Sequence, residues 1–394
     1  MHISRKMTAP LLVAAALAIA GCAGSSTSSS IPAQTQSVHQ SAGGPHLYSF
    51  HGRTVAGPFA SEKMNDQWAH RSVTPSMGVD TIYPAAKCAN TARLFGSDNT
   101  TGNLDVFCED GVTGKPNVHV KTLAGAAGWG VAVQPSGRML AVGKSGGTIS
   151  VYASALNPTT PSVTLTLSGQ SAGDNAYGLC WDDKGGLYAT NWPANTIDYF
   201  AGPLVSGGPT STITTTTVTE DYYLACDFDK RETGNNGDLL VYGFNTSSPN
   251  VDSDVAIVAL PAGPDTVVQT LGSLNTGNGF PGGLAMSAKD DLLANDQYGT
   301  LYDLGVKEPW KTAPVGSCTW GFNPNDYTNI AFDNTQTEVW ASDINFGGTT
   351  YLQSNGAPPL SGTCVTPGES GGPTAPISGE GSYLGVAVYP NLGD

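Results

Sequence analysis

A short pattern of small and apolar residues recurs along this chain, and its spacing predicts the architecture. Most copies read as glycine, an aliphatic residue, alanine or cysteine, and then a larger side chain. Six copies occur, 46 to 59 residues apart, at 130–133, 178–181, 224–227, 283–286, 329–332 and 385–388. Repeats of this length with strand-like content indicate a propeller or a solenoid.

Between the copies, short apolar runs alternate with turn residues. In the first unit we expect strands at 139–142, 148–152 and 162–167 after the turn at 134–137. The second unit repeats the pattern at 187–189, 197–200 and 212–218, with a loop at 191–195. Four short antiparallel strands separated by Gly, Pro and Asp turns make one propeller blade.

The two ends of the chain complete one another. The last copy, at 385–388, leaves no room for further strands before Asp394, and the missing three match 93–97, 103–107 and 119–123. A blade shared by both ends closes the ring and leaves no free sheet edge. The sequence therefore predicts an all-β, six-bladed β-propeller over residues 81–394.

The first unit also carries a family resemblance. Residues 130–137, 140–142 and 149–152 look like an NHL-type repeat, and they are similar to related six-bladed propellers that include the SMP-30/gluconolactonase group. The resemblance covers most of residues 90–394. It implies the fold, whereas propellers host many unrelated activities.

The gluconolactonase group implies a divalent metal near the channel mouth. An acidic residue holds it there together with an Asn and an Asp that precede the glycine of a first strand. The corresponding positions here are Trp129, Tyr177, Tyr223, Gly282, Thr328 and Leu384. None is Asp or Asn, which argues against lactonase chemistry.

The N-terminal residues are typical of an export signal. Arg5 and Lys6 precede an apolar stretch at 7–19 that is too short to span a bilayer. Residues 19–22 resemble the bacterial lipobox, so we predict a lipoprotein signal peptide at 1–21 and lipidation of Cys22. Ordinary signal cleavage is the alternative. Ala23 in place of Asp implies the outer membrane or cell surface of a bacterial envelope.

Residues 22–80 are expected to form a flexible tether rich in Ser and Gly, since they contain too few apolar groups to offset the entropy of ordering. The whole chain carries a formal charge of −15, and removal of Arg5 and Lys6 leaves −17 on the mature chain. That balance argues against a nucleic-acid partner.

Histidine is scarce where catalysis would need it. The six histidines are His2, His39, His46, His51, His70 and His119, and none follows residue 119. A Ser-His-Asp hydrolase needs a histidine base in the domain, and a His-ligated zinc or copper site needs clustered imidazoles. We therefore expect no resident metal or cofactor, and leave open a calcium ion in the central funnel.

One rim of the ring carries the candidate ligand-binding residues, because the loop into a first strand and the loop after a second strand share a face. They are Trp129, Lys144, Tyr177, Asn191, Trp192, Tyr223, Asp296 and Asp343. Aromatic faces beside carboxylates and amides suit a sugar or a peptide. The alternatives are that the rings pack between blades and that the polar residues cap turns.

Two further features are structural predictions. The segment beginning at Asp227 matches a calcium loop poorly and is interpreted as a long turn. Six cysteines follow Cys22, and an even number in an exported chain favours disulfides. We predict Cys88–Cys108 and Cys318–Cys364. The remaining pair, Cys180 and Cys226, forms either a third disulfide or two small buried thiols.

The leading functional prediction is a monomeric, lipid-anchored, non-catalytic binding or scaffold module outside the cytoplasm. Its expected partners are the membrane, through the anchor alone, and a sugar, a peptide or an envelope protein. The alternative is a metal-dependent lactonase or strictosidine-synthase-like hydrolase that uses carboxylate ligands. A third interpretation is a spacer in an envelope complex.

Overall fold

The computed structural model describes residues 47–50, 53–56, 81–82, 88, 91–99, 101–109, 119–135, 137–169, 175–192, 194–214, 222–229, 237–245, 252–259, 267–271, 274, 281–297, 299–306, 313–319, 327–343, 351–356, 377–378 and 383–391. The predicted signal peptide, Cys22 and Cys364 lie outside these residues.

Five four-stranded antiparallel sheets follow one another along the chain. Blade one contains β7 (Val131–Val133), β8 (Leu140–Lys144), β9 (Thr148–Tyr152) and β10 (Val163–Thr166). Blade two contains β11 (Asn175–Trp181), β12 (Leu187–Trp192), β13 (Thr196–Phe200) and β14 (Ser211–Thr214). Asn191 and Trp192, which were expected in a loop, therefore end a strand.

The remaining three of these sheets have the same plan. Blade three contains β15 (Tyr222–Asp229), β16 (Asp238–Asn245), β17 (Asp252–Ala259) and β18 (Val267–Leu271). Blade four contains β19 (Pro281–Met286), β20 (Asp291–Asp296), β21 (Thr300–Val306) and β22 (Gly316–Thr319). Blade five contains β23 (Tyr327–Phe332), β24 (Glu338–Asp343), β25 (Tyr351–Gly356) and β26 (Ile377–Ser378).

The sixth sheet joins the two ends of the propeller. It contains β27 (Tyr383–Tyr389), β4 (Arg93–Asp98), β5 (Leu104–Cys108), β6 (His119–Leu123) and β3 (Thr81–Ile82), in that order. β27 pairs with β4 from Tyr383 opposite Asp98 to Tyr389 opposite Arg93. The blade shared by both ends is therefore present, and β3 extends its outer edge by one strand.

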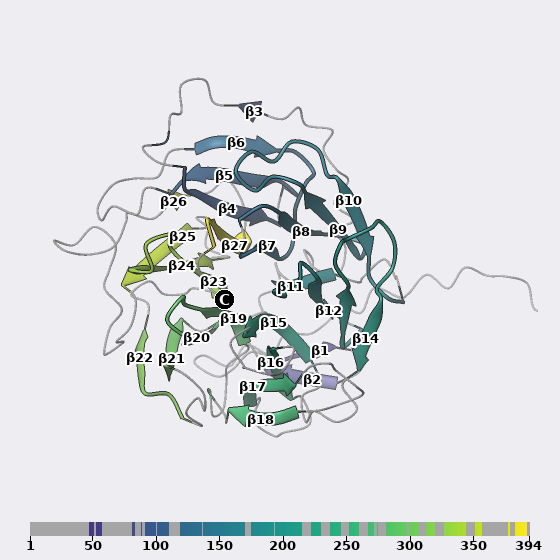
Figure 1. Ribbon diagram of the computed structural model, residues 1–394. Coiled ribbons are helices and arrows are strands. Elements are labelled where there is room, and N and C mark those ends of the chain that lie inside the picture. Colours follow the sequence, from purple (N-terminus) through teal and green to yellow (C-terminus); the bar gives the residue numbers. More distant parts are fainter. Residues whose placement is uncertain are drawn as a thin grey trace, which may run out of the picture. The chain divides into compact units, whose positions relative to one another are not determined.

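The first strands of the blades form the inner ring. β7, β11, β15, β19, β23 and β27 contact one another in that order, and β27 contacts β7 (Figure 1). The predicted β-propeller is confirmed. The blades number five if only sheets of four consecutive strands are counted, and six with the shared sheet.

Close approach of the inner strands explains the recurring glycine. A Cβ at Gly130 would overlap the carbonyl oxygen of Tyr177 in the next blade. One at Gly178 would lie 2.7 Å from the carbonyl oxygen of Leu224. Gly283 and Gly385 are equally close to the inner strands that follow them around the ring. The recurring glycine therefore marks the points where the backbones of two neighbouring inner strands leave no room for a side chain.

Apolar faces of neighbouring blades make the core. Between blades one and two, for example, Ile149 and Val151 pack with Trp181 and Leu187, all at most 3% exposed. Each sheet buries a face that it could not bury alone, as expected for a repeat architecture.

β1 (Leu47–Phe50) and β2 (Arg53–Ala56) pair within the segment expected to be a flexible tether. Within the described part of the chain, no helix has the length and hydropathy needed to cross a membrane.

Candidate functional site

The aromatic residues of the predicted rim lie mostly inside the protein. Trp129, Tyr177 and Tyr223 are only 6%, 3% and 3% exposed. The ring of Tyr177 lies 5.8 Å from that of Trp129 and 5.8 Å from that of Trp192, centroid to centroid. Packing between blades was the alternative to ligand binding for these rings. The contacts support it, because the buried rings of Trp129 and Tyr177 meet at the junction of blades one and two.

The polar members of the rim mostly hold turns. Asp296, 1% exposed, accepts hydrogen bonds from the Thr300 amide (2.9 Å) and the Tyr302 hydroxyl (2.7 Å). Burial, and then the Asp296 carboxylate, raises the pKa of Tyr302, which keeps this donor protonated. Asn191, also 1% exposed, donates from Nδ2 to the carbonyl oxygen of Ser168 (3.0 Å). Asp343 ends β24, and its side chain lies outside the description.

Lys144 and Trp192 remain partly exposed. Ser145, next to Lys144, forms an isolated bridge with Asn175, and Asn175 pairs with Trp192 across β11 and β12. The topology therefore brings the ends of β8 and β12 together. We call Lys144, Ser145, Asn175 and Trp192, all partly exposed, the Lys144–Trp192 patch.

The described residues of this rim do not reproduce the ligand set that the gluconolactonase group uses for its divalent metal. Buried rings of Trp129, Tyr177 and Tyr223 stand where that group places its Asn and Asp. Among the described residues, no three His, Cys, Asp or Glu side chains are grouped so as to hold a metal ion. The described side chains at this rim therefore differ from the ligand set of that group.

The ring encloses a cavity at the opposite ends of the inner strands. Its volume is about 80 Å³, and every inner strand contributes to its wall. The wall starts at the recurring pattern and continues to Pro135 and Asn391, while Trp129, Tyr177 and Tyr223 are not part of it. Sequence reasoning placed the binding face at the starts of the inner strands, and the cavity lies towards their C-terminal ends.

Polar side chains in the cavity wall bond to inner-strand backbone. The Trp181 indole donates to the carbonyl oxygen of Ala132 (3.2 Å), and Asn391 donates to that of Val133 (3.0 Å). Asp227 accepts from the Met286 amide of the next blade (2.7 Å) and from the Phe228 amide (2.8 Å). Backbone groups that face the channel have no neighbouring strand to pair with, so these side chains satisfy them.

The segment beginning at Asp227 was interpreted as a long turn, and this was wrong for Asp227 itself, which lies within β15. The part of that segment between Asp229 and Gly237 lies outside the described residues. Its role could have been found from the fourth place of the recurring pattern. That place holds Val133, Trp181, Asp227, Met286, Phe332 and Val388, all of which line the cavity. The signal was a carboxylate at a place of the pattern that otherwise holds apolar or aromatic side chains.

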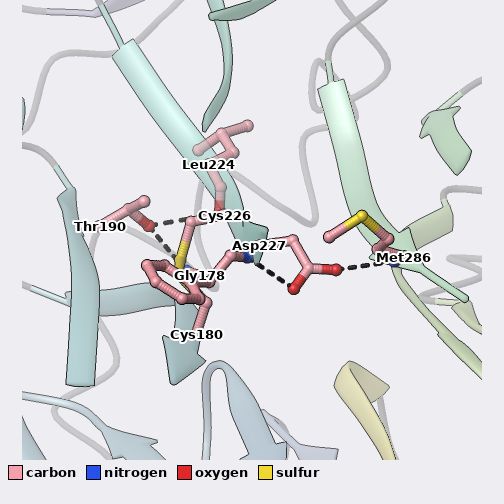
Figure 2. Close-up of a disulfide and its surroundings, with 8 residues drawn as sticks. Gly178, Cys180, Thr190, Leu224, Cys226, Asp227 and Met286 are labelled. Carbon is pink, nitrogen blue, oxygen red and sulfur yellow. Dashed lines mark hydrogen bonds between the residues drawn. A yellow bond between two sulfur atoms is a disulfide. The ribbon is translucent and has the colours of Figure 1, made fainter. Parts of the chain in front are cut away.

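Disulfides tie the propeller at two described places. Cys88–Cys108 is confirmed. Cys180–Cys226 is a disulfide rather than two thiols, and it links β11 to β15 in the cavity wall (Figure 2). Nearby, Thr190 accepts from the Gly178 amide and donates to the carbonyl oxygen of Leu224. Cys318 is also disulfide-bonded, and its predicted partner Cys364 lies outside the described residues.

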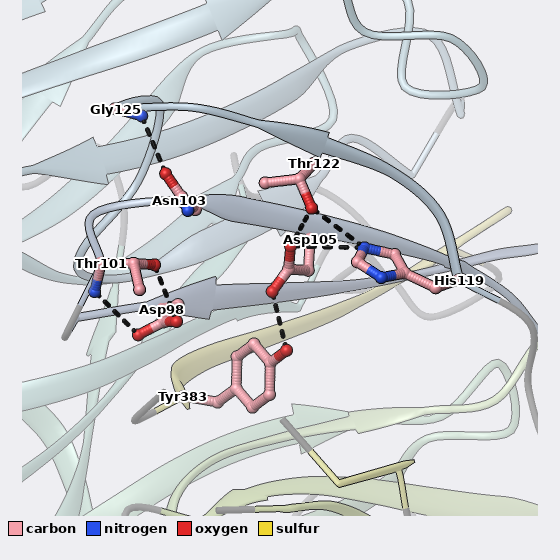
Figure 3. Close-up of polar contacts among 8 residues, drawn as sticks. All are labelled: Asp98, Thr101, Asn103, Asp105, His119, Thr122, Gly125 and Tyr383. Atoms are coloured by element: carbon pink, nitrogen blue, oxygen red, sulfur yellow. Dashed lines mark hydrogen bonds and ion pairs between the residues drawn. The ribbon is translucent and has the colours of Figure 1, made fainter. Parts of the chain in front are cut away.

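His119 belongs to a polar network in the shared sheet (Figure 3). Asp105 accepts from the hydroxyls of Thr122 (2.6 Å) and Tyr383 (2.8 Å), and His119 Nε2 lies 3.4 Å away. Burial opposes ionisation of Asp105, but the hydrogen bonds from His119, Thr122 and Tyr383 lower its pKa overall. The network joins β5 and β6 to β27, so it links the two ends of the ring.

Neither a protein-family model nor a curated protein matches this sequence. Among solved structures, the chain is similar to the Neurospora crassa Pan2 WD40 domain, with 13% identity and a TM-score of 0.39. The similarity covers 59% of this chain and 66% of that one. A likeness at this level carries no argument about ligand or activity.

Proposed function

We propose that this protein is a non-catalytic binding or scaffold lipoprotein of the bacterial envelope, held by a lipid on Cys22. The propeller fold is consistent with a binding or scaffold role. The observation that carries the proposal is that the buried polar side chains make hydrogen bonds within the ring. Asp105, Asn191, Asp227 and Asp296 bond to the turns and strands of the ring, while the Lys144–Trp192 patch stays partly exposed.

The disulfides support a location outside the cytoplasm. Disulfides persist in oxidising compartments and are rare where thiols are kept reduced. Cys180–Cys226 joins two inner strands of the ring, β11 and β15. An export signal and an oxidising destination are therefore mutually consistent.

Fractionation of the natural host, or of a diderm bacterium that makes the full chain, tests the anchor. The protein should be found with membranes, and Cys22→Ser should release it without changing its melting temperature. The matched control is Ser37→Ala, a change of similar size within the predicted tether that touches neither the anchor nor a described disulfide. An intact mass lacking a diacylglycerol adduct on the mature N-terminus would refute the lipid anchor.

The Lys144–Trp192 patch is the proposed ligand surface of this function. A partly exposed indole supplies apolar contact, and Lys144 supplies a cation that suits an anionic or carbonyl-bearing sugar or peptide. The mature protein should be tested on an array of envelope oligosaccharides and acidic peptides. Trp192→Ala and Lys144→Ala should each abolish a signal that Thr164→Ala, an exposed change on β10, retains. Signals that all three variants keep equally would exclude the patch.

A further inference from the structure

The described charged side chains that are exposed lie at one end of the blades. They occupy the turns that follow the first strands of blades one, two and four, and they are Arg138, Asp183, Lys184 and Lys289. In a blade of four antiparallel strands, this turn and the connection after the third strand lie at the same end, and the turn after the second strand lies at the opposite end. The exposed charges are therefore gathered on one side of the ring.

The exposed large apolar side chains of the described residues lie at the same end. They are Leu156, Val205 and Val315, which are 37%, 75% and 57% exposed. Each stands in the connection between the third and fourth strands of its blade, again in blades one, two and four. The three blades that carry an exposed cation thus also carry an exposed aliphatic side chain.

Backbone contacts hold the cation and the aliphatic residue of a blade near one another. In blade one, the backbone N–H of the residue before Leu156 donates to the carbonyl oxygen of Arg138 (2.9 Å). In blade two, a Cβ added to Gly202 would lie 2.7 Å from the carbonyl oxygen of Lys184, so the connection that carries Val205 packs against the Lys184 turn. Blade four places its cation and its aliphatic residue in the same two connections.

Turns of neighbouring blades meet at this end. A Cβ added to Gly185 would lie 3.2 Å from Nε2 of Gln134 in blade one. The Ala288 amide donates to Oε1 of Gln336 in blade five (2.9 Å). The pairs therefore belong to one face of the ring, which we call the basic–apolar face and define by Arg138, Leu156, Lys184, Val205, Lys289 and Val315.

This face is cationic although the chain is acidic. The whole chain has a formal charge of −15, whereas the exposed charged side chains at this end are three cations and Asp183. The partly exposed acidic residues at this end, Asp227 and Asp291, lie within strands rather than in the turns that form the face. Cations attract anionic headgroups, and aliphatic side chains enter the boundary between headgroups and acyl chains. The stems of Arg and Lys can lie along that boundary with their charge in the headgroup layer.

We propose that the basic–apolar face lies on a phospholipid bilayer that contains anionic lipids. The aliphatic side chains would enter the boundary below the headgroups, and the cations would bond to headgroup phosphates. The inference rests on the proposed function, because a lipid on Cys22 would hold the propeller beside the bilayer and let a weak contact suffice. The Lys144–Trp192 patch, which lies where second strands end, would then point away from the membrane and towards its ligand.

Vesicles of phosphatidylcholine, with and without phosphatidylglycerol, test the proposal on the unlipidated mature chain, Cys22→Ser. A polarity-sensitive fluorophore attached to Val205→Cys should brighten saturably with the phosphatidylglycerol vesicles. The same fluorophore on Ala194→Cys, exposed in the turn between β12 and β13 at the opposite end, should not respond. The described cysteines are disulfide-bonded, so the label is directed to the added thiol.

Paired variants locate the contact, with vesicle affinity measured by sedimentation. Arg138→Ala with Lys289→Ala should weaken binding at least about tenfold, because each basic residue near an anionic surface contributes roughly fivefold. Leu156→Ser with Val205→Ser should weaken it by about tenfold as well, through lost apolar burial. Lys144→Ala removes the same charge from the opposite end and should leave the vesicle affinity unchanged. The four paired positions are exposed, so the melting temperatures should match that of the parent.

Failure of this inference is distinguishable from failure of the proposed function. No binding of phosphatidylglycerol vesicles, equal affinity for both kinds of vesicle, or equal responses of the Val205 and Ala194 labels would overturn the membrane face. A dimer that dissociates in Leu156→Ser with Val205→Ser, without vesicle binding, would assign the face to a second copy and overturn it as well. Absence of a lipid on Cys22 would leave these titrations unchanged, because they use the unlipidated chain.

Discussion

The junctions between neighbouring blades are of two kinds. At four of them the inner strand carries glycine, at Gly130, Gly178, Gly283 and Gly385, and the next backbone lies against it. At the other two, Leu224 and Asn329 take the place of glycine. One ring is thus closed in two physical ways.

Side chains bridge the junctions that lack glycine. After Leu224, Asp227 accepts the Met286 amide of blade four (2.7 Å). Directly before Asn329, the Thr328 hydroxyl donates to the carbonyl oxygen of Tyr383 in the shared sheet (3.2 Å). Polar side chains also cross glycine junctions, as Trp181 and Thr190 do. The difference is that a glycine junction has no room for a side chain at that place, whereas a junction without glycine already holds one there. The two kinds should therefore respond to different substitutions.

The largest effect is expected where a covalent bond reinforces a glycine junction. Cys180–Cys226 closes 46 residues, so Cys180→Ala with Cys226→Ala should lower the free energy of unfolding by about 4 kcal/mol in the chain-entropy estimate. The comparison pair, Cys88 and Cys108, closes 20 residues outside the inner ring and should cost about 3 kcal/mol. Urea denaturation measures both. A loss below about 1 kcal/mol for the inner pair would mean that Gly178 alone closes this junction.

Glycine itself gives the next effect. Gly130→Ala places a Cβ against the Tyr177 carbonyl, and the forced shift of backbone should cost about 3 kcal/mol. Gly208 has no atom near an added Cβ, so Gly208→Ala should stay within about 0.5 kcal/mol of the parent. Denaturant midpoints of the two variants provide the measurement. Equal midpoints would show that the inner strands separate freely.

The fold followed from the sequence because one constraint repeats. The recurring pattern marks the inner strand of each blade, and the orphan copy at 385–388 predicted the shared sheet that β27 completes. Strand β3 was missed because two residues, Thr81 and Ile82, carry no periodicity. Positions that every blade needs leave a pattern, and a single added edge strand leaves none.

The candidate site followed less well, because burial is a property of three dimensions. Trp129, Tyr177 and Tyr223 were rightly placed at the starts of inner strands, but a sequence does not say whether a ring faces solvent or the next blade. The capping role of Asp296 was one of the alternatives and is what its bonds show. The place of Asp227 in the cavity wall was missed because the residues after it resembled a turn. The other residues in the fourth place of the recurring pattern line the same cavity.

Junctions without glycine should respond to loss of polar atoms. Asp227→Ala removes an acceptor from the Met286 amide and should cost about 2 kcal/mol, while Thr328→Val, at the other such junction, should cost about 1 kcal/mol. Asp183→Ala, in an exposed turn, should stay within about 0.5 kcal/mol. These values come from the same urea titrations. An Asp227→Ala variant as stable as Asp183→Ala would remove the distinction between the two kinds of junction.

The smallest effect concerns the strand that closes the ring. Tyr383, on β27, receives Thr328 through its carbonyl and donates from its hydroxyl to Asp105, so Tyr383→Phe should cost about 1 kcal/mol at pH 7. The cost should depend on pH. Because the folded-state pKa of Asp105 lies below its unfolded value of about 3.9, its ionised form stabilises the fold above that pH, and this stabilisation is lost as pH falls through the folded pKa.

Removing the Tyr383 hydroxyl takes away one of the bonds that lower that pKa, so the variant has less to lose in acid. The difference in unfolding free energy between parent and Tyr383→Phe should therefore stay constant near neutral pH and shrink as pH falls below about 4, through the folded-state pKa of Asp105. Thr122→Val removes another donor to Asp105 and should show the same trend. Thr328→Val, which acts on the backbone oxygen of Tyr383, should not. A difference that is constant across this range would place the hydroxyl's contribution in packing, and the closing strand would then be held by its backbone pairing with β4.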